Sequence, residues 1–229
     1  YHRDGPTSTI GIVESHARGL SRSIIVNGKS DGNTIGNDLK TVNLVGQLPS
    51  LLTTAKLDKV AVIGFGTGIT AGSLSLYPEV KEVHVFEISP LVNEYAHLFD
   101  FANHELSKSI KIRWHLGDAY QKILADHEKY SIICSEPSNP WVTGVERLYS
   151  QEFLELAKQR LEKGGIYSQW FHLYDISPDT FKLVLNTFRN VFPFVRIFQV
   201  ESDVILLGSV DEPGLENLKQ LEQKWQLPA

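Results

Sequence analysis

The sequence has few of the residues that build disulfides, metal sites or nucleic-acid surfaces. Its single cysteine, Cys134, excludes an intrachain disulfide and fits a reducing compartment, and the apolar residues around it indicate a thiol buried in a strand. The eight histidines are scattered without the spacing of metal ligands, so we expect no metal site. No run of lysine and arginine exceeds two residues and the formal net charge is −5, which argues against binding to nucleic acid.

Long apolar segments are also scarce. The 19 residues from Val60 to Pro78 carry no charge, but their four glycines and several hydroxyl groups fit a strand, a loop and a helix better than a membrane span. The first fifteen residues carry charge and lack an apolar stretch, so we expect no signal peptide and a cytoplasmic location. The chain begins at Tyr1 and contains no methionine, so we expect either a fragment or mature form, or modified methionines that the sequence does not show.

The residues that are present predict two regions. With 42% hydrophobic and 21% charged residues, the 229-residue chain has the composition of a soluble protein with a proper core. In residues 1–48, two β-rich segments at 8–13 and 22–26 precede a strong turn signal at Asn27 and Gly28, which predicts a small β-hairpin region. Residues 49–229 are expected to form one larger domain.

Apolar and amphipathic segments alternate through the larger domain. Strands are expected at residues 60–64, 82–88, 110–116, 130–135, 165–170, 195–199 and 204–208, and helices near 69–76, 91–99, 119–125, 150–161 and 178–191. Apolar strands joined by crossover helices predict a mostly parallel sheet with helices on both faces. Only a few residues join the last two strands, so we expect an antiparallel hairpin at one edge of this α/β, Rossmann-like fold.

The first strand of the larger domain ends in a turn that contains Gly64, Gly66 and Gly68. Glycines there let the backbone approach a ligand, and the helix that follows points its N-terminal NH groups toward the same place. A dinucleotide site would have a glycine at the sixth position of the motif, where this chain has Ile69. The pattern therefore argues against a dinucleotide and leaves a nucleoside site as the favoured interpretation.

Two acidic residues follow the next strands. Glu87 ends the second strand and can accept hydrogen bonds from both hydroxyls of a ribose, whereas Asp118, followed by Ala119, ends the third and can accept from an adenine amino group. The alternative is that both acids only cap helices or face solvent. Three such signals in the correct order favour a nucleoside site, because open sheets bind ligands at the carboxyl ends of their strands.

The fourth strand ends in Glu136, in a stiff loop that also holds Asn139 and Trp141. We expect this loop to lie over the nucleoside pocket; the alternative is a rigid connector. The segment after the fifth strand contains His172, Tyr174 and Asp175, and by position it should form a wall of an acceptor pocket. An aromatic core cluster is the competing interpretation of that segment.

These motifs resemble the spermidine synthase family of polyamine aminopropyltransferases, particularly its divergent bacterial branch, from about residue 23 to residue 208. The resemblance implies a class I S-adenosylmethionine-dependent methyltransferase-type fold with a small N-terminal β appendage. It also implies that decarboxylated S-adenosylmethionine, or its thioether product, binds to the motif residues Gly64, Gly66, Gly68, Glu87, Asp118 and Ala119. In that family the residue matching Glu136 helps to deprotonate and orient the attacking amine.

The chain also departs from that family. Asn139 stands where the family has a second loop aspartate, Thr67 where the glycine-rich turn usually has an aspartate, and Thr41 where a tyrosine lines the polyamine tunnel. A tyrosine-proline stretch before the last strand is replaced by residues 199–203. Burial of a dicationic diamine requires paired carboxylates. The side chains that can compensate from nearby loops are Glu201, Asp203, His172 and Asp175.

The leading hypothesis is a transferase of polyamine biosynthesis that moves an aminopropyl group from decarboxylated S-adenosylmethionine to a small-molecule amine, with Glu136 accepting the proton and Asn139 positioning the amine. One alternative is methyl transfer from intact S-adenosylmethionine to an unknown small molecule, because a neutral Thr67 does not select the decarboxylated form. Another is a non-catalytic nucleoside-binding domain. The resemblance also suggests a homodimer and leaves open a fusion to a membrane segment outside this chain.

Overall fold

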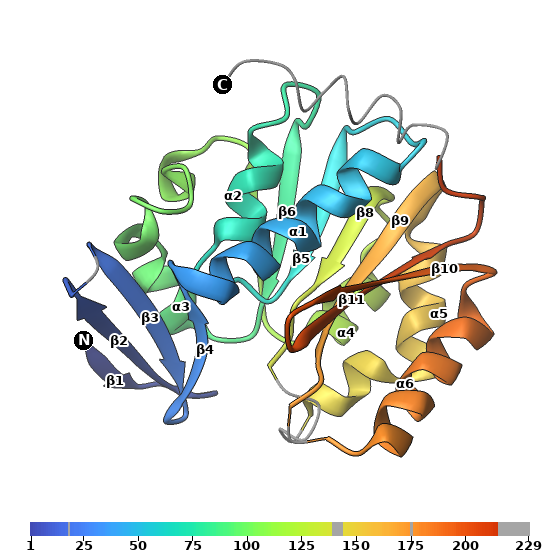
Figure 1. Ribbon diagram of the computed structural model, residues 1–229. Helices are drawn as coiled ribbons and strands as arrows, with labels where there is room; N and C mark the ends of the chain where they lie inside the picture. Colours follow the sequence, from blue (N-terminus) through green and yellow to red (C-terminus); the bar gives the residue numbers. More distant parts are fainter. Residues whose placement is uncertain (18, 139–143, 175, 215–229) are drawn as a thin grey trace.

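Two sheets organise the computed structural model of the chain, which describes residues 1–17, 19–138, 144–174 and 176–214 (Figure 1). The first is antiparallel and has four strands in chain order, β1 (His2–Asp4), β2 (Thr9–Ser15), β3 (Ser21–Val26) and β4 (Lys29–Asn33). Asn27 and Gly28 form the predicted turn between β3 and β4, with φ angles of 50° and 84°. The sequence predicted only two of these strands, because β1 and β4 are short and polar.

The second sheet has seven strands. They are β5 (Lys59–Ile63), β6 (Glu82–Glu87), β7 (Ile112–Leu116), β8 (Tyr130–Ser135), β9 (Leu161–His172), β10 (Phe194–Val200) and β11 (Asp203–Ser209). Their order is β10-β11-β9-β8-β5-β6-β7, and the pairs from β9 to β7 are parallel. β11 runs antiparallel to both β9 and β10. The predicted α/β fold with an antiparallel hairpin at one edge is therefore confirmed.

Helices cover both faces of this sheet. They are α1 (Gly36–Leu52), α2 (Ile69–Ser75), α3 (Pro90–Tyr95), α4 (Ala119–Ala125), α5 (Gln151–Gln159) and α6 (Pro178–Val191), with short 3₁₀ turns η1 (Ala96–Phe99), η2 (Leu106–Lys108) and η3 (Val145–Tyr149). Val60 and Val62 of β5 pack in a core cluster with α1, α2 and α3, while Ala61 and Ile63 pack in a second cluster with α4, α5 and α6. Successive side chains of a strand point to opposite faces, so one buried strand serves both cores.

The small sheet packs against the same core as the large one. Ile10 and Ile24 are fully buried and belong to the cluster that contains Val62 and α1. Arg22 of β3 donates a hydrogen bond to the carbonyl of Leu98 in η1 and lies over the ring of Phe101. Figure 1 shows the small sheet, in dark blue, beside α3 and the lower end of the large sheet. This contact places the N-terminal strands next to the strand ends where the sequence predicted a site.

Two further features bear on the sequence predictions. No helix within the described ranges is long and apolar enough to cross a membrane. α1 runs across residues 48 and 49, so one continuous helix joins the N-terminal strands to the large sheet. The sequence also predicts a terminal helix over residues 211–229, and most of it falls on residues 215–229, which lie outside the described residues.

Candidate active site

A cavity of about 490 Å³ lies at the carboxyl ends of β5, β6 and β8. Strand ends, the small sheet, the first turns of α1 and the edge hairpin all contribute to its lining. Seven predicted site residues line it: Gly64, Gly66, Glu87, Asp118, Ala119, Glu136 and Tyr174. The fold therefore brings into one space residues that are separated by more than 100 positions in the sequence.

The glycine-rich turn after β5 is shaped by backbone angles that favour glycine. Gly64, Gly66 and Gly68 have φ angles of 82°, 53° and 75°. A Cβ atom added at Gly64 would lie 2.6 Å from the carbonyl oxygen of Glu136, so the turn and the end of β8 are in close contact. Gly68 precedes α2 and does not line the cavity; a Cβ atom there would lie 2.3 Å from the ring of Phe65.

Glu87 links the end of β6 to this turn. Its carboxylate is buried and accepts hydrogen bonds from the backbone NH groups of Phe65, at 2.9 Å, and Ser89, at 2.8 Å. Burial raises the pKa of Glu87, although these NH groups favour the ionised form. Each carboxylate oxygen has a second lone pair, so Glu87 can still accept from ligand hydroxyls. Ile88, which follows it, is 55% exposed and presents an apolar surface to the cavity.

Asp118 has a structural contact as well as a place in the cavity lining. One oxygen accepts a hydrogen bond from the backbone NH of Gln121 and so caps α4, as the alternative interpretation expected. The other oxygen lies 3.7 Å from the guanidinium of Arg147, which itself lies over the ring of Tyr120. Arg147 and Tyr120 also line the cavity, and no sequence motif predicted either of them.

Glu136 lies directly after β8, and its backbone NH donates to the carbonyl of Ile63. The residue is half-buried, but its Oε1 atom is inaccessible and makes no hydrogen bond with any described residue. Burial raises the pKa of the Glu136 carboxyl to about 8. A carboxylate with this pKa can accept a proton near neutral pH.

Of the four predicted acceptor-side residues, the structure describes two, which lie in different places. Tyr174 lines the cavity. His172 is fully buried in an aromatic cluster, with ring centroids 4.2 Å from Tyr174 and 5.5 Å from Phe171, and does not line the cavity. Asn139 and Asp175 lie outside the described residues. Within the described ranges no group of three or more histidine, cysteine or acidic side chains could hold a metal ion.

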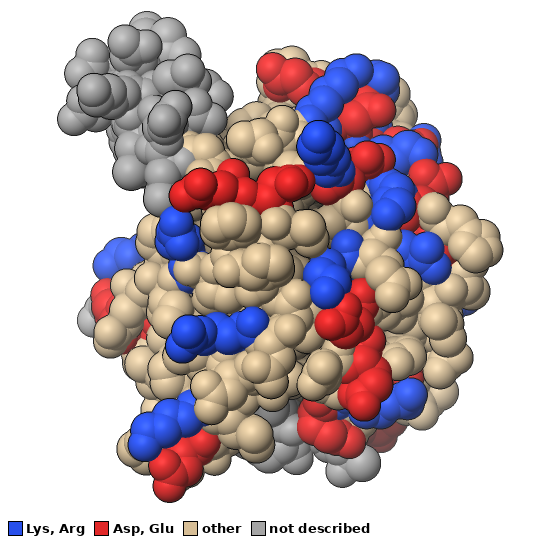
Figure 2. Space-filling view, turned by 90° about the vertical axis from the view of Figure 1, so that its right-hand side faces the viewer, with Lys and Arg blue, Asp and Glu red and all other residues tan. Residues whose placement is uncertain are grey.

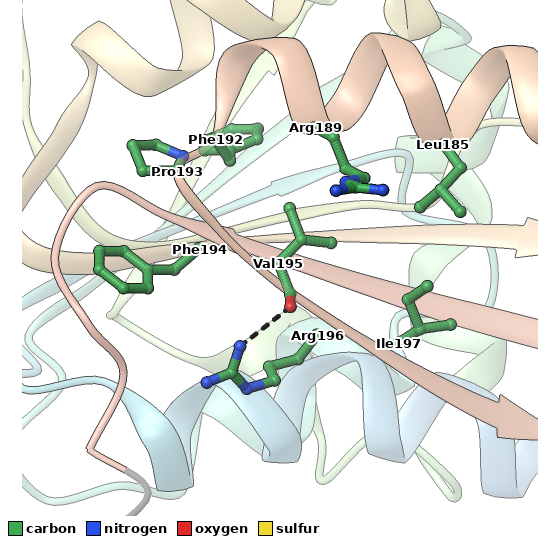
Figure 3. A pocket seen from close by; sticks show the side chains of 8 residues that line it. All are labelled: Leu185, Arg189, Phe192, Pro193, Phe194, Val195, Arg196 and Ile197. Atoms are coloured by element: carbon green, nitrogen blue, oxygen red, sulfur yellow. Dashed lines mark hydrogen bonds between the residues drawn. The ribbon is translucent and has the colours of Figure 1, made fainter.

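A second cavity of about 420 Å³ lies between α6 and β10, at the edge of the large sheet (Figure 3). Its lining includes Leu185, Arg189 and Arg196, and the Arg196 guanidinium donates to the Val195 carbonyl at 3.1 Å. Figure 2 shows this side of the molecule, on which both basic and acidic side chains lie among uncharged ones. None of the predicted site residues lines this cavity, so it lies apart from the candidate site.

Residues 43–213 match the family model described as the spermine/spermidine synthase domain. The chain belongs to this family. It is 28% identical over 181 residues to polyamine aminopropyltransferase 2 of Hyperthermus butylicus, covering 78% of this chain and 58% of that protein. It is 24% identical over 221 residues to the polyamine aminopropyltransferase of Sulfolobus acidocaldarius, covering 90% of this chain and 70% of that protein. The chain spans about half the length of two other relatives: it covers 48% of the polyamine aminopropyltransferase of Sulfurisphaera tokodaii and 51% of that of Prochlorococcus marinus.

Solved structures of other proteins share the fold of this chain, and two of them are spermidine synthases. Spermidine synthase from Thermotoga maritima is 16% identical, with a TM-score of 0.80 over 95% of this chain and 74% of that one. A spermidine synthase in complex with the transition state analogue AdoDATO gives 0.81 over 95% of this chain and 75% of that one, also at 16% identity. Human methyltransferase-like protein 13 in complex with SAH gives 0.64 at 20% identity, covering 84% and 93%. At these identities the likeness establishes a Rossmann-like methyltransferase-type fold.

This member of the spermine/spermidine synthase family has a strongly acidic cavity. Among the described residues, six carboxylates line it against two basic side chains, Lys29 and Arg147, and the acids are Asp31, Asp38, Glu87, Asp118, Glu136 and Asp203. Asp203 was among the side chains expected to compensate for the missing family acids, whereas Glu201 does not line the cavity. Asp31 and Asp38 were not expected. They lie on a polar strand and in the first turn of α1, and only the tertiary fold brings them to the site.

Proposed function

We propose that this family member transfers an aminopropyl group from decarboxylated S-adenosylmethionine to an amine. The observation that carries the proposal is the placement of Glu136, with its raised pKa, in the same acidic cavity as the glycine turn and Glu87. The names of the relatives, polyamine aminopropyltransferases, support the same activity.

The nucleoside end of the donor fits the residues around Glu87. The turn at Gly64 and Gly66 exposes backbone to the cavity, the free lone pairs of Glu87 can accept from ribose hydroxyls, and Ile88 offers an apolar surface to a purine. The excess of acids favours a donor that carries an ammonium group and no carboxylate. Intact S-adenosylmethionine brings a carboxylate into this negative field, so the cavity charge argues against methyl transfer.

Glu136 has the chemical role of proton acceptor in the proposal. The amine nitrogen forms a bond to the carbon beside sulfur, the carbon–sulfur bond breaks, and sulfur leaves as a neutral thioether. Only an uncharged amine can attack, and Glu136 takes the proton that the ammonium form must lose. The remaining rate enhancement comes from holding the two reactants in line, and the residues that line the cavity hold them there.

The test uses the whole chain with decarboxylated S-adenosylmethionine and 1,4-diaminobutane, and measures methylthioadenosine and the aminopropylated amine. Glu136→Gln keeps the shape of the side chain and removes the proton acceptor, so kcat should fall by about 10²- to 10⁴-fold. The dissociation constant for methylthioadenosine should stay unchanged. Methylated product formed only from the intact donor would establish the alternative, and product formation unaffected by Glu136→Gln would contradict the role of Glu136.

The assembly and location implied by the family resemblance are further proposals. We expect a homodimer, which light scattering on the purified chain can measure. The cytoplasmic location and a link to a membrane segment outside this chain stay predictions, and cell fractionation of the full-length protein tests both.

A further inference from the structure

Two histidines on neighbouring strands of the large sheet are in contact, and neither lines the cavity. Nδ1 of His84, on β6, lies 3.0 Å from Nε2 of His115, on β7, and the two rings stack with their centroids 5.0 Å apart. His84 is 6% exposed, and its Nε2 atom lies 3.3 Å from a carboxylate oxygen of Glu82. The hydroxyl of Tyr130, a fully buried residue at the start of β8, lies 3.2 Å from Nδ1 of His84 and donates a hydrogen bond to Asp126. These side chains form one polar network.

This network accommodates one added proton but not a second. A charged His84 donates one ring N–H to Glu82 and turns the other toward His115, whose facing nitrogen accepts it when that ring is neutral. The oxygen of Tyr130 faces the same N–H, because the tyrosine's own proton is directed to Asp126. A charge on both histidines would place two N–H groups and two positive charges against each other at 3.0 Å. A second proton therefore separates the two rings.

The second proton belongs to His115. Burial, and then the charge of His84, lower the pKa of His115, so its neutral form is favoured in the folded protein. This contribution to stability is complete above the ordinary histidine pKa of about 6.5 and is lost as the pH falls below that value. The charged groups that face the network are Glu82 of β6, Lys122 and Asp126 at the end of α4, Lys59 of β5, Arg113 of β7, Glu128 before β8 and Arg160 after α5.

The ring stack reaches the nucleoside end of the cavity through Phe86. The ring of His115 stacks on the ring of Phe86 with centroids 4.5 Å apart. Phe86 lines the cavity and directly precedes Glu87. The strand that carries His115, β7, leads directly into Gly117 and Asp118. A movement of His115 therefore acts on the two strand ends whose acids are expected to hold the nucleoside.

We propose that the pair of His84 and His115 is a proton-operated switch for the nucleoside end of the cavity. In mild acid a second proton separates the two rings, removes His115 from Phe86 and weakens binding of the adenosine part of the donor. The proton comes from solvent, and no covalent bond to carbon forms or breaks. This inference rests on the proposed nucleoside site and acts separately from the proton exchange assigned to Glu136.

Calorimetric titration of the whole chain with methylthioadenosine, at about pH 7.5 and at about pH 5.5, measures the switch. Glu136, with a pKa of about 8, is mostly protonated over this range. The dissociation constant should be about three- to tenfold larger at the lower pH, since one linked proton changes an equilibrium by at most about tenfold per pH unit. His115→Gln gains no proton and can still donate to His84, so most of this increase should disappear. His97→Gln, on the exposed turn η1, is the matched control and should keep the full response.

Nuclear magnetic resonance of the histidine rings tests the switch without a ligand. The ring of His115 should stay neutral to below about pH 6.5, and its nuclear Overhauser contact with Phe86 should disappear over the pH range in which the ring becomes charged. A charged His115 that stays on Phe86, or a full response to pH in His115→Gln, overturns the inference. Failure of methylthioadenosine to bind at either pH would overturn the proposed nucleoside site, and the ring contact would then decide the switch alone. His115→Phe keeps an aromatic ring beside Phe86 and serves as the variant if His115→Gln does not fold.

Discussion

At the scale of single residues, the environment of Glu136 decides how the site responds to pH. Its carboxyl follows a completely buried strand, and burial raises its pKa to about 8. Glu87 is also buried and its pKa is also raised, but it accepts two backbone hydrogen bonds, whereas Oε1 of Glu136 has no partner among the described residues. Two acids in one cavity therefore have different surroundings: Glu87 is fixed to the backbone, and Glu136 is the one to which we assign the exchange of a proton.

The rate should rise with pH until Glu136 is ionised. Because its pKa is raised, the acid form dominates below about pH 8, and kcat/KM for the amine should rise about tenfold per pH unit before levelling off. In Glu136→Gln the break near pH 8 in the plot of kcat/KM against pH should disappear, and kcat/KM should continue to rise until the amine itself deprotonates. The measurement is a pH profile of kcat/KM, and a break near pH 8 that persists in the variant would assign it to another group.

At the scale of elements, the contact between the β5–α2 turn and the end of β8 holds Glu136, the proposed proton acceptor, beside the proposed nucleoside site. Gly64 has a φ angle of 82°, and any side chain there would approach the carbonyl of Glu136 to 2.6 Å. The turn and the Glu136 backbone are therefore in close contact, and a side chain at position 64 would push them apart. One glycine sets both the shape of the turn and the position of Glu136.

Gly64→Ala should damage both stability and activity. The positive φ angle alone costs about 1–2 kcal/mol for a residue with a Cβ atom, and the close contact must also displace Glu136. We expect kcat to fall by about tenfold or more, since small misplacements of a reacting group are costly. Gly28→Ala is the matched control, because Gly28 has a φ angle of 84° but open space around its Cβ position. Urea unfolding and kcat would be measured for both. Equal stability losses with full activity in Gly64→Ala would contradict the positioning role.

At the scale of the whole molecule, the small sheet and the large sheet share one core. Ile10, Ile12 and Ile24 belong to the same buried cluster as Val45 of α1 and Val62 of β5. The small sheet also supplies cavity-lining residues, among them Asp31, which accepts a hydrogen bond from Ser138 just beyond Glu136. The N-terminal strands are therefore part of the site as well as of the fold, and we expect the two sheets to unfold together.

Ile24→Ala tests this shared core. Removing a fully buried isoleucine side chain costs about 2–5 kcal/mol, and here the loss should lower the midpoint of a single urea transition for the whole chain. Ile25→Ala, on the opposite and less buried face of β3, should cost less than half as much. Two separate transitions, with only the first one shifted, would mean that the small sheet unfolds independently.

Most of the large sheet could be predicted from the sequence, because its strands are short apolar segments separated by glycines and amphipathic helices. β8 is a completely buried segment and was predicted with its observed bounds. β4 was missed because its residues, Lys29 to Asn33, are polar and include a glycine, which gives no strand pattern. Glu87 and Glu136 could be predicted because each lies at the carboxyl end of a strand. Asp31 and Asp38 were not, because nothing local in the sequence predicts which side chains face a cavity formed by two sheets and a helix.

The hydrogen bond between Thr41 and Asp203 has a consequence for how this protein can diverge. It ties the first turns of α1 to a hairpin at the rim of the sheet, whose turn is formed by Glu201 and Ser202, so part of the cavity lining comes from the periphery of the fold. Insertions in such a turn leave the central strands in register. Descendants of this protein can therefore change the shape of the cavity through a few residues at the periphery, while the central strands stay as they are.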